Sequence, residues 1–147
     1  MMNTEKYYNF NEVEGYNFTH LRPINDRYSI AELSPKRQKS FYGKALILIA
    51  PFSSALFSYG TPIIARYFDE DRSAFYYHRL YDGGYEIERH AYGMVFTDWS
   101  DRVSPTTLRH IDAFCGMNKK QFMELPMDYD EARHWKQFYI NILNGKR

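Results

Sequence analysis

The chain has 147 residues, and its 19 lysine and arginine residues nearly balance its 18 aspartate and glutamate residues. This length fits a single domain, residues 1–147, with a hydrophobic core of its own. Because the charges balance, the overall charge gives no reason to expect binding to nucleic acid or to a membrane surface. The one cysteine, Cys115, excludes an internal disulfide, and this usage is typical of a reducing cytoplasm.

The longest apolar run, residues 45–52, is far shorter than the roughly 20 residues that cross a bilayer. The amino-terminal stretch also lacks the pattern of a secretory signal, so we expect a soluble, cytoplasmic protein that does not enter a membrane. Aromatic residues make up 18% of the chain, with 14 tyrosines and 11 phenylalanines. This content favours either a small domain rich in strands or an interaction surface, because tyrosine is enriched at interfaces.

The amino-terminal two thirds of the chain predict an arm and then a sheet. Residues 1–33 are polar without a clean period, which indicates an irregular arm with at most one edge strand. Residues 34–103 predict an antiparallel meander with an enlarged hairpin, because Asp82 and two glycines form a strong turn signal. Strands are expected over residues 43–50, 55–68, 74–81 and 85–97.

From residue 104 to 147 the apolar spacing is helical. Helices are predicted over residues 105–117, 118–125 and 128–143, and Ser104 with Pro105 provides a good start for the first. Strands followed by helices indicate the α+β class. We expect an antiparallel meander of about four strands, followed by two or three carboxy-terminal helices packed on one face.

The segment from Ser104 to Phe114 is either a catalytic cluster or a well-capped helix with a polar face. Its apolar residues share one face, which indicates packing in the core. His110 lies beside that face and is expected to make one structural hydrogen bond, while Cys115 on the face is expected to be an inert buried thiol. A small enzyme would use His110 with Thr106, Thr107 or Arg109, but the sequence assembles no nucleophile, base and orienting group.

Other chemistry leaves few candidates. The five histidines are dispersed and no metal-binding motif occurs, so we expect no metal and no cofactor. The most basic segment, with Lys36, Arg37, Lys39 and Lys44, is either a solvated loop or a patch that faces phosphates or acids. The acidic residues Asp128, Asp130 and Glu131 are either a helix start or a patch that imitates phosphates.

Two stretches, "SYGTPIIA" at 58–65 and "SPTTLRHIDAF" at 104–114, resemble a small family of uncharacterised proteins from phages, plasmids and mobile elements of gut and oral bacteria. The resemblance covers roughly residues 40 to 116, and this chain departs from it by the enlarged hairpin. The matching residues are Tyr59, Thr61, Trp99, Thr106, Thr107, Arg109, His110, Ile111 and Phe114. The resemblance implies an accessory protein of a mobile element that acts in the cytoplasm of a bacterial host cell.

Taken together, these patterns favour a non-enzymatic protein that binds and inhibits a bacterial host protein, such as a CRISPR–Cas nuclease. The candidate partner-binding residues are Tyr76, Tyr77, Tyr81, Tyr85, Tyr92, Asp128, Asp130 and Glu131. A nucleic-acid-binding module that uses the basic segment and stacking aromatic side chains is the alternative. A small enzyme based on His110 is the third hypothesis.

Overall fold

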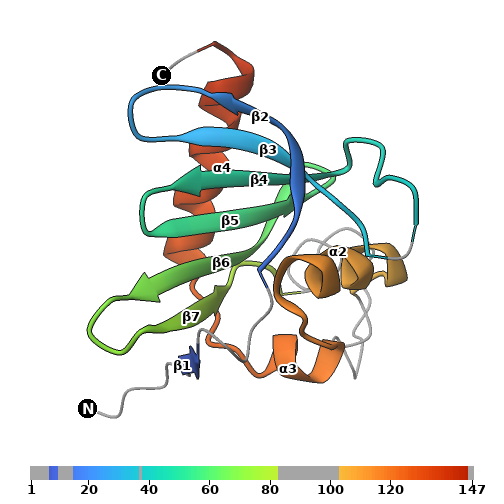
Figure 1. Ribbon diagram of the computed structural model, residues 1–147, viewed down its shortest axis with the longest axis vertical. Helices are drawn as coiled ribbons and strands as arrows, with labels where there is room; N and C mark the ends of the chain where they lie inside the picture. Colours follow the sequence, from blue (N-terminus) through green and yellow to red (C-terminus); the bar gives the residue numbers. More distant parts are fainter. Residues whose placement is uncertain (1–6, 10–14, 37, 83–102, 146–147) are drawn as a thin grey trace, which may run out of the picture.

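The computed structural model describes residues 7–9, 15–36, 38–82 and 103–145 (Figure 1). These residues form an antiparallel sheet of seven strands in the order β1-β7-β6-β5-β4-β3-β2, so β2 to β7 are a meander and β1 extends its far edge. The strands are β1 (Tyr7–Asn9), β2 (Phe18–Pro23), β3 (Ser29–Leu33), β4 (Ala45–Ala50), β5 (Ser53–Ser58), β6 (Thr61–Asp69) and β7 (Ala74–Arg79). The helices are α2 (Pro105–Cys115), α3 (Lys119–Met123) and α4 (Tyr129–Leu143). The α+β class and the antiparallel meander are confirmed.

The sheet is larger than the four expected strands for two reasons. The segment predicted to be an irregular arm supplies β1, β2 and β3, and the β2–β3 turn is closed by Asn25, whose Oδ1 accepts hydrogen bonds from the backbone N–H of Arg27 and Tyr28. The expected strand over residues 55–68 is instead a hairpin of β5 and β6. Tyr59 and Gly60 both have positive φ, 53° and 79°, which is the backbone of a two-residue hairpin turn.

The helices cover both faces of the sheet, so the prediction that they share one face was wrong. Figure 1 shows α2 and α3 in front of the sheet and α4 behind it. The reason lies in β4, β5 and β6, where consecutive apolar residues are buried and therefore point to opposite faces. One core, around Ile47, Leu56 and Phe114, lies under α2 and α3. The other, around Leu48 and Trp135, lies under α4.

Local capping explains why the predicted helices begin where they do. The Ser104 hydroxyl accepts a hydrogen bond from the Thr107 N–H at 3.1 Å, as the sequence predicted. Asn118 begins α3 with reciprocal hydrogen bonds to Gln121, and Asp128 accepts from the Glu131 N–H at 3.0 Å to begin α4. The apolar stripe of α4, which includes Trp135 and Tyr139, packs on the sheet.

The start of α4 is fastened to the end of β7 by backbone hydrogen bonds. The Arg79 N–H donates to the Pro126 carbonyl at 2.8 Å, and the Asp128 N–H donates to the Arg79 carbonyl at 3.0 Å. The expected fourth strand, residues 85–97, lies outside the described residues. None of the described helices is both long and apolar enough to span a membrane.

The turn at Gly60 gives the first prediction. Replacing Gly60 with alanine should lower the free energy of unfolding by about 1–2 kcal/mol, because the left-handed backbone is costly for a residue with a Cβ. The added Cβ would lie at an ordinary van der Waals distance of 3.6 Å from Tyr139. The loss of stability therefore measures the backbone strain of the left-handed conformation and not a steric clash. Urea unfolding monitored by circular dichroism gives the value. Gly15→Ala is the control, since a Cβ there meets nothing within 4 Å, and an equal loss in both variants would contradict the turn assignment.

Candidate functional site

Among the tyrosines predicted to bind a partner, the three that the structure describes do not form one exposed surface. Tyr77 is fully buried in the core under α2 and α3, so its assignment as a contact residue was wrong; alternate residues of β7 face that core. Tyr76 is half-buried and packs between the rings of Tyr7 and Tyr67. Tyr81 packs against the core under α2 and α3. Tyr85 and Tyr92 lie outside the described residues.

The acidic residues mostly serve α4 itself. Asp128 is the N-cap of the helix, and Glu131 bonds His78. Asp130 is exposed and pairs with Arg133 one turn along. The interpretation of this segment as a helix start therefore accounts for Asp128 and Asp130, while Glu131 makes a long-range contact that the sequence did not reveal.

The basic segment is a loop before β4. Lys36 lies 3.5 Å from Asp112 of α2, Lys39 and Lys44 are exposed, and Arg37 lies outside the described residues. The Lys44 ammonium lies 6.0 Å from the centre of the Tyr59 ring.

Part of the motif from the resemblance meets at one place, between β5 and α2. The Ser58 hydroxyl lies 2.8 Å from His110 Nδ1 and 3.1 Å from Thr107 Oγ1, and Thr107 also accepts from Ser104 at 3.1 Å. Tyr59 lies beside the His110 ring, and Thr61 begins β6. Thr106 instead accepts a hydrogen bond from Arg109, and Trp99 lies outside the described residues.

This network is sealed from solvent. Ser58 and His110 are only 3% and 1% exposed, and Phe41 packs edge-on against the imidazole. Burial, helped by the charge of Arg109, lowers the pKa of His110 from 6.5 to about 4, so the imidazole is neutral at neutral pH. As expected, Cys115 is a buried thiol, and burial raises its pKa to about 12. The hydrogen bonds of His110 and Thr107 hold α2 on the sheet.

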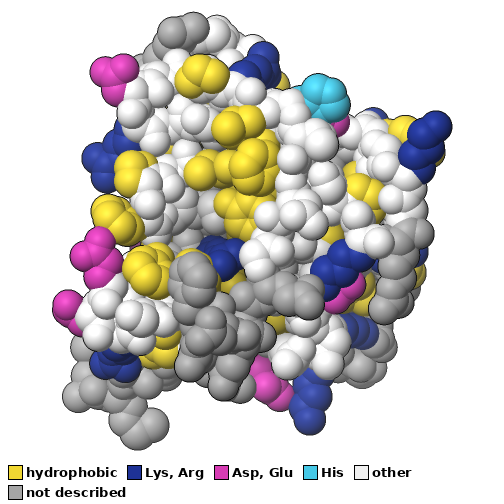
Figure 2. Space-filling model, viewed as in Figure 1, with side chains coloured by type: hydrophobic (Ala, Val, Ile, Leu, Met, Phe, Trp, Pro, Cys, Tyr) yellow, Lys and Arg dark blue, Asp and Glu magenta, His cyan; other side chains and the backbone are white. Residues whose placement is uncertain are grey.

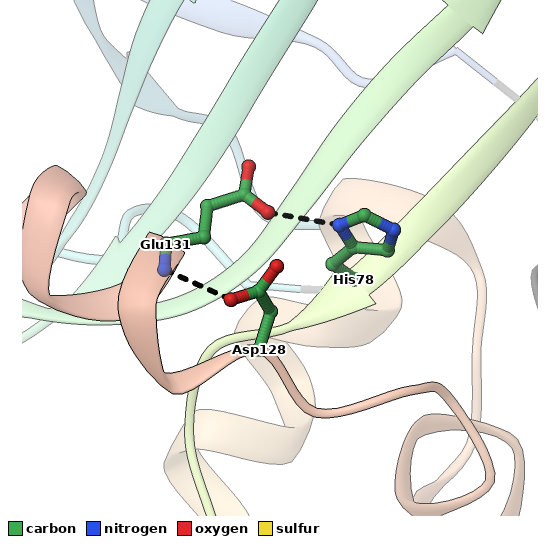
Figure 3. Close-up of side chains that lie close together, drawn as sticks. All are labelled: His78, Asp128 and Glu131. Atoms are coloured by element: carbon green, nitrogen blue, oxygen red, sulfur yellow. Dashed lines mark hydrogen bonds and ion pairs between the residues drawn. The ribbon is translucent and has the colours of Figure 1, made fainter.

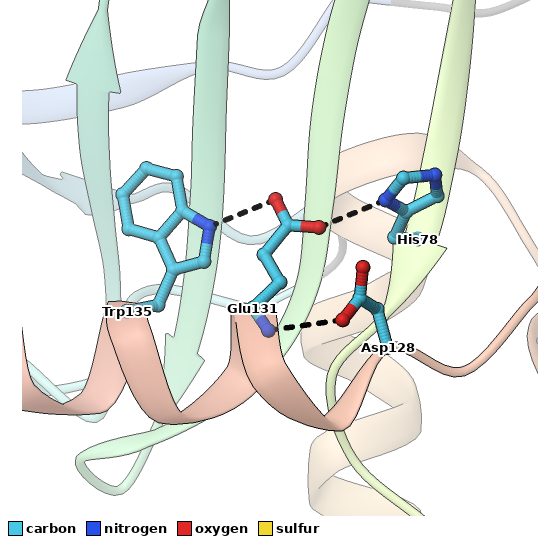
Figure 4. Close-up of polar contacts among 4 residues, drawn as sticks. All are labelled: His78, Asp128, Glu131 and Trp135. Atoms are coloured by element: carbon cyan, nitrogen blue, oxygen red, sulfur yellow. Dashed lines mark hydrogen bonds and ion pairs between the residues drawn. The ribbon is translucent and has the colours of Figure 1, made fainter.

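A second polar cluster lies on the opposite face, at the start of α4. His78 Nδ1 is 2.8 Å from Glu131 Oε2, and Asp128 lies beside both (Figure 3). Trp135 donates to the other oxygen of Glu131 at 3.3 Å (Figure 4). The ligand atoms of His78, Asp128 and Glu131 all lie within 4.8 Å of one another, and all three residues are half-buried. The sequence separates His78 from Glu131 by 53 residues, so no local spacing could have revealed the cluster.

A pocket with a largely aromatic wall opens on the face that carries α2, at the end of the sheet that α2 leaves uncovered. Figure 2 shows hydrophobic side chains gathered on this face, next to a hollow that holds a basic side chain. The pocket has a volume of about 440 Å³. Its lining residues are Gly15, Tyr16, Phe18, Ile49, Ala50, Pro51, Phe52, Ser53, Ser54, Arg66, Phe68 and Phe75. Its wall is therefore aromatic and aliphatic, apart from two serines and one arginine.

Arg66 is the unusual member of this lining. It lies on β6 directly opposite Ser54 of β5, and only 7% of it is exposed. Its guanidinium stacks on the Phe75 ring at 3.5 Å and lies 5.6 Å from the Tyr16 ring. Tyr16 in turn stacks on Phe114 of α2. The stacking fixes the plane of the guanidinium beside the pocket.

Among the described residues, no carboxylate pairs with Arg66. A buried charge is costly unless it is paired, and a desolvated cation–π contact offsets part of that cost by about 2 kcal/mol or more. The fold thus places a largely buried cation beside the pocket, with aromatic rings rather than an acidic group around it. The sequence did not reveal the position of Arg66 beside a pocket. Arg66 stands among apolar residues of β6, and only the residues around its guanidinium in the folded protein distinguish a structural role from a binding role.

Comparison of the chain with protein-family models, with curated proteins and with solved structures gave no match. The site is therefore interpreted from its own geometry.

The sealed network gives a prediction for pH. His110→Asn should lower the free energy of unfolding by about 1–3 kcal/mol at neutral pH, because it removes buried ring contacts. The unfolded wild type binds a proton near pH 6.5 and the folded one only near pH 4, so wild-type stability falls as the pH drops through this window. The difference in the free energy of unfolding between wild type and variant should therefore narrow by up to about 3 kcal/mol as the pH falls from 6.5 to about 4.

Urea unfolding of both proteins at a series of pH values measures this gap. Carboxylates titrate in both proteins and cancel in the difference, which isolates His110. A gap that stays constant from neutral pH down to about pH 4 would contradict the buried neutral histidine.

Proposed function

We propose that the protein is a non-enzymatic binding protein, and that the pocket beside Arg66 receives a carboxylate carried on an apolar group. The observation that supports this most is the buried Arg66 guanidinium, which has no acidic partner among the described residues and borders a pocket of about 440 Å³. Apolar pockets of this size with a few polar groups are the usual form of a ligand site.

The chemistry of the lining favours one type of ligand. A guanidinium donates two parallel hydrogen bonds to a carboxylate or a phosphate. Arg66 is the only charged residue among the described residues that line the pocket, so a single negative charge matches it better than a doubly charged phosphate. The rings of Phe52, Phe68 and Phe75 suit an aryl or alkyl body, and Ser54 places a hydroxyl beside Arg66.

The proposal of a non-enzymatic role also draws on the Ser58–His110 pair. A nucleophile and a base within hydrogen-bond reach suggest catalysis, but both residues are buried between β5 and α2. Catalysis would require a substrate to reach the hydroxyl, and the pocket beside Arg66 does not include Ser58 or His110. The simplest role for that pair is structural.

The sequence-based expectation of a mobile-element protein that inhibits a bacterial host protein, such as a CRISPR–Cas nuclease, stays a prediction. It is compatible with the pocket, because the carboxyl terminus of a partner protein presents a carboxylate beside an apolar side chain. A small aryl or alkyl acid presents the same group. Peptides with a free or an amidated carboxyl terminus, compared with small acids, separate these two sources.

The proposal predicts an opposite effect of Arg66→Met on binding and on stability. Binding of 3-phenylpropionate, measured by calorimetry, should weaken at least tenfold, because charged hydrogen bonds contribute about 1.5–3 kcal/mol. The free energy of unfolding should stay equal or rise by about 1 kcal/mol, because an uncompensated buried charge is replaced by an apolar side chain. The neutral analogue 3-phenylpropionamide should bind weakly to both proteins.

The control is Arg27→Met, which removes an exposed arginine outside the pocket and should change neither quantity. Equal binding of the acid and the amide by the wild type would contradict the proposal. So would a loss of about 2 kcal/mol or more in the stability of Arg66→Met, which would make Arg66 a structural residue.

A second candidate function, binding of single-stranded nucleic acid, is favoured by one observation. Tyr42 and Tyr59 are 75% and 59% exposed. Tyr42 precedes Lys44 by two positions in the chain, and the Lys44 ammonium lies 6.0 Å from the centre of the Tyr59 ring. Lys136 of α4 donates to the Gly60 carbonyl at 2.7 Å. Together with Lys44 and Tyr59 it lines a second pocket, separate from the pocket beside Arg66. Exposed aromatic rings between cations are the usual platform for stacking bases.

This candidate predicts that a labelled single-stranded oligonucleotide binds, that added salt weakens binding, and that Tyr59→Ala weakens it about tenfold. Fluorescence anisotropy gives the affinities. Tyr129→Ala, which removes another half-exposed tyrosine outside that pocket, is the control. Binding that ignores salt, or that is weakened equally by both substitutions, would rule this function out.

A further inference from the structure

The second polar cluster points to a function that is independent of the Arg66 pocket. We propose that His78, Asp128 and Glu131 form a binding site for a divalent transition-metal ion of the Zn²⁺ type. The three side chains come from the end of β7 and from the first turn of α4, and Figure 3 shows them turned toward one another.

The distances suit a metal ion. Zn²⁺ binds imidazole nitrogen and carboxylate oxygen at about 2.0–2.2 Å, which places neighbouring ligand atoms about 3–3.6 Å apart. His78 Nδ1 and Glu131 Oε2 are 2.8 Å apart, and the whole set lies within 4.8 Å. Small side-chain rotations therefore bring the three ligand atoms around one ion, without a backbone shift.

Each ligand is held in place by its surroundings. Asp128 is fixed through the backbone hydrogen bond to the Arg79 carbonyl and through its own cap of α4. Trp135 holds the outer oxygen of Glu131 (Figure 4), and the rings of Tyr67 and Tyr76 pack beside the His78 imidazole. Such outer contacts orient ligands and are typical of built metal sites.

The ligand types select the kind of metal. One imidazole with two carboxylates is a mixed nitrogen and oxygen set, whereas Ca²⁺ and Mg²⁺ prefer oxygen alone. Three protein ligands leave a position for water or another group. The chain also contains a built-in comparison: His20 lies 2.9 Å from Glu32, but the described residues place no third ligand beside that exposed pair. Cys115 is fully enclosed and does not compete for the ion.

The test is a calorimetric titration of the full chain with Zn²⁺ after treatment with a chelator. We expect one ion per chain, and an affinity that falls at least about 10- to 100-fold in Asp128→Asn and in His78→Asn. Asp128→Asn is the decisive variant, because asparagine caps a helix as well as aspartate does and the fold is kept. Circular dichroism and urea unfolding verify that each variant is folded.

The controls are Asp130→Asn, which removes an exposed carboxylate from the same helix turn, and His20→Asn, which removes the histidine of the two-ligand pair. Both should bind Zn²⁺ as the wild type does. Co²⁺ provides an independent readout, because its visible absorption reports ligand nitrogen and coordination number, and the bands should be lost in His78→Asn. Absence of saturable binding, or binding that survives in Asp128→Asn and His78→Asn, would overturn the proposal.

Arg66→Met should bind Zn²⁺ normally, since Arg66 and His78 project from opposite faces of the sheet. If the experiments contradict the carboxylate pocket, the metal-site proposal is therefore unaffected. If they contradict the metal site, the proposal of the carboxylate pocket is likewise unaffected. Loss of Zn²⁺ binding in Arg66→Met would contradict the independence of the two sites.

Discussion

Burial of both faces of β4, β5 and β6 is the constraint on which the rest of the structure depends. Ile47, Leu56 and Ile64 point to one face, and Leu48, Phe57 and Ala65 to the other, all fully buried. A sheet of this kind must be covered twice, so the three carboxy-terminal helices divide between its faces. The Ser58–His110 contact joins α2 to the front of the sheet, and the backbone link between Arg79 and Asp128 brings α4 to the back.

The two faces are covered unequally, and the candidate sites follow from that. The short α2 and α3 leave one end of their face open, and there Arg66 borders an aromatic pocket instead of a packed core. On the other face, the first turn of α4 brings Glu131 and Asp128 against His78 of β7. The sealed His110 network is of a different kind: its polar groups satisfy one another and expose nothing to a ligand. A largely buried cation such as Arg66, which has no acidic partner among the described residues, is the better indicator of binding.

Local chemistry determined what could be predicted from sequence. Ser104, Asn118 and Asp128 act within their own helices, so the helix starts and the core stripes of α2 and α4 could be predicted. The β5–β6 hairpin was missed because Tyr59 supplies a positive φ that glycine or asparagine usually provides. The sites were missed because they depend on register. Which face Arg66 occupies, and which residue meets His78, are decided by strand pairing and by helix placement between distant segments.

The claim that Arg66 is a ligand-binding cation is tested most directly by nuclear magnetic resonance of its side-chain Nε–H group. The resonance is assigned by its absence in Arg66→Met and followed while 3-phenylpropionate is added to the ¹⁵N-labelled wild type. The account predicts a saturable shift of this resonance with the acid and little change with the amide. A resonance that does not move while the acid shifts other parts of the protein, or that moves equally with acid and amide, would contradict it.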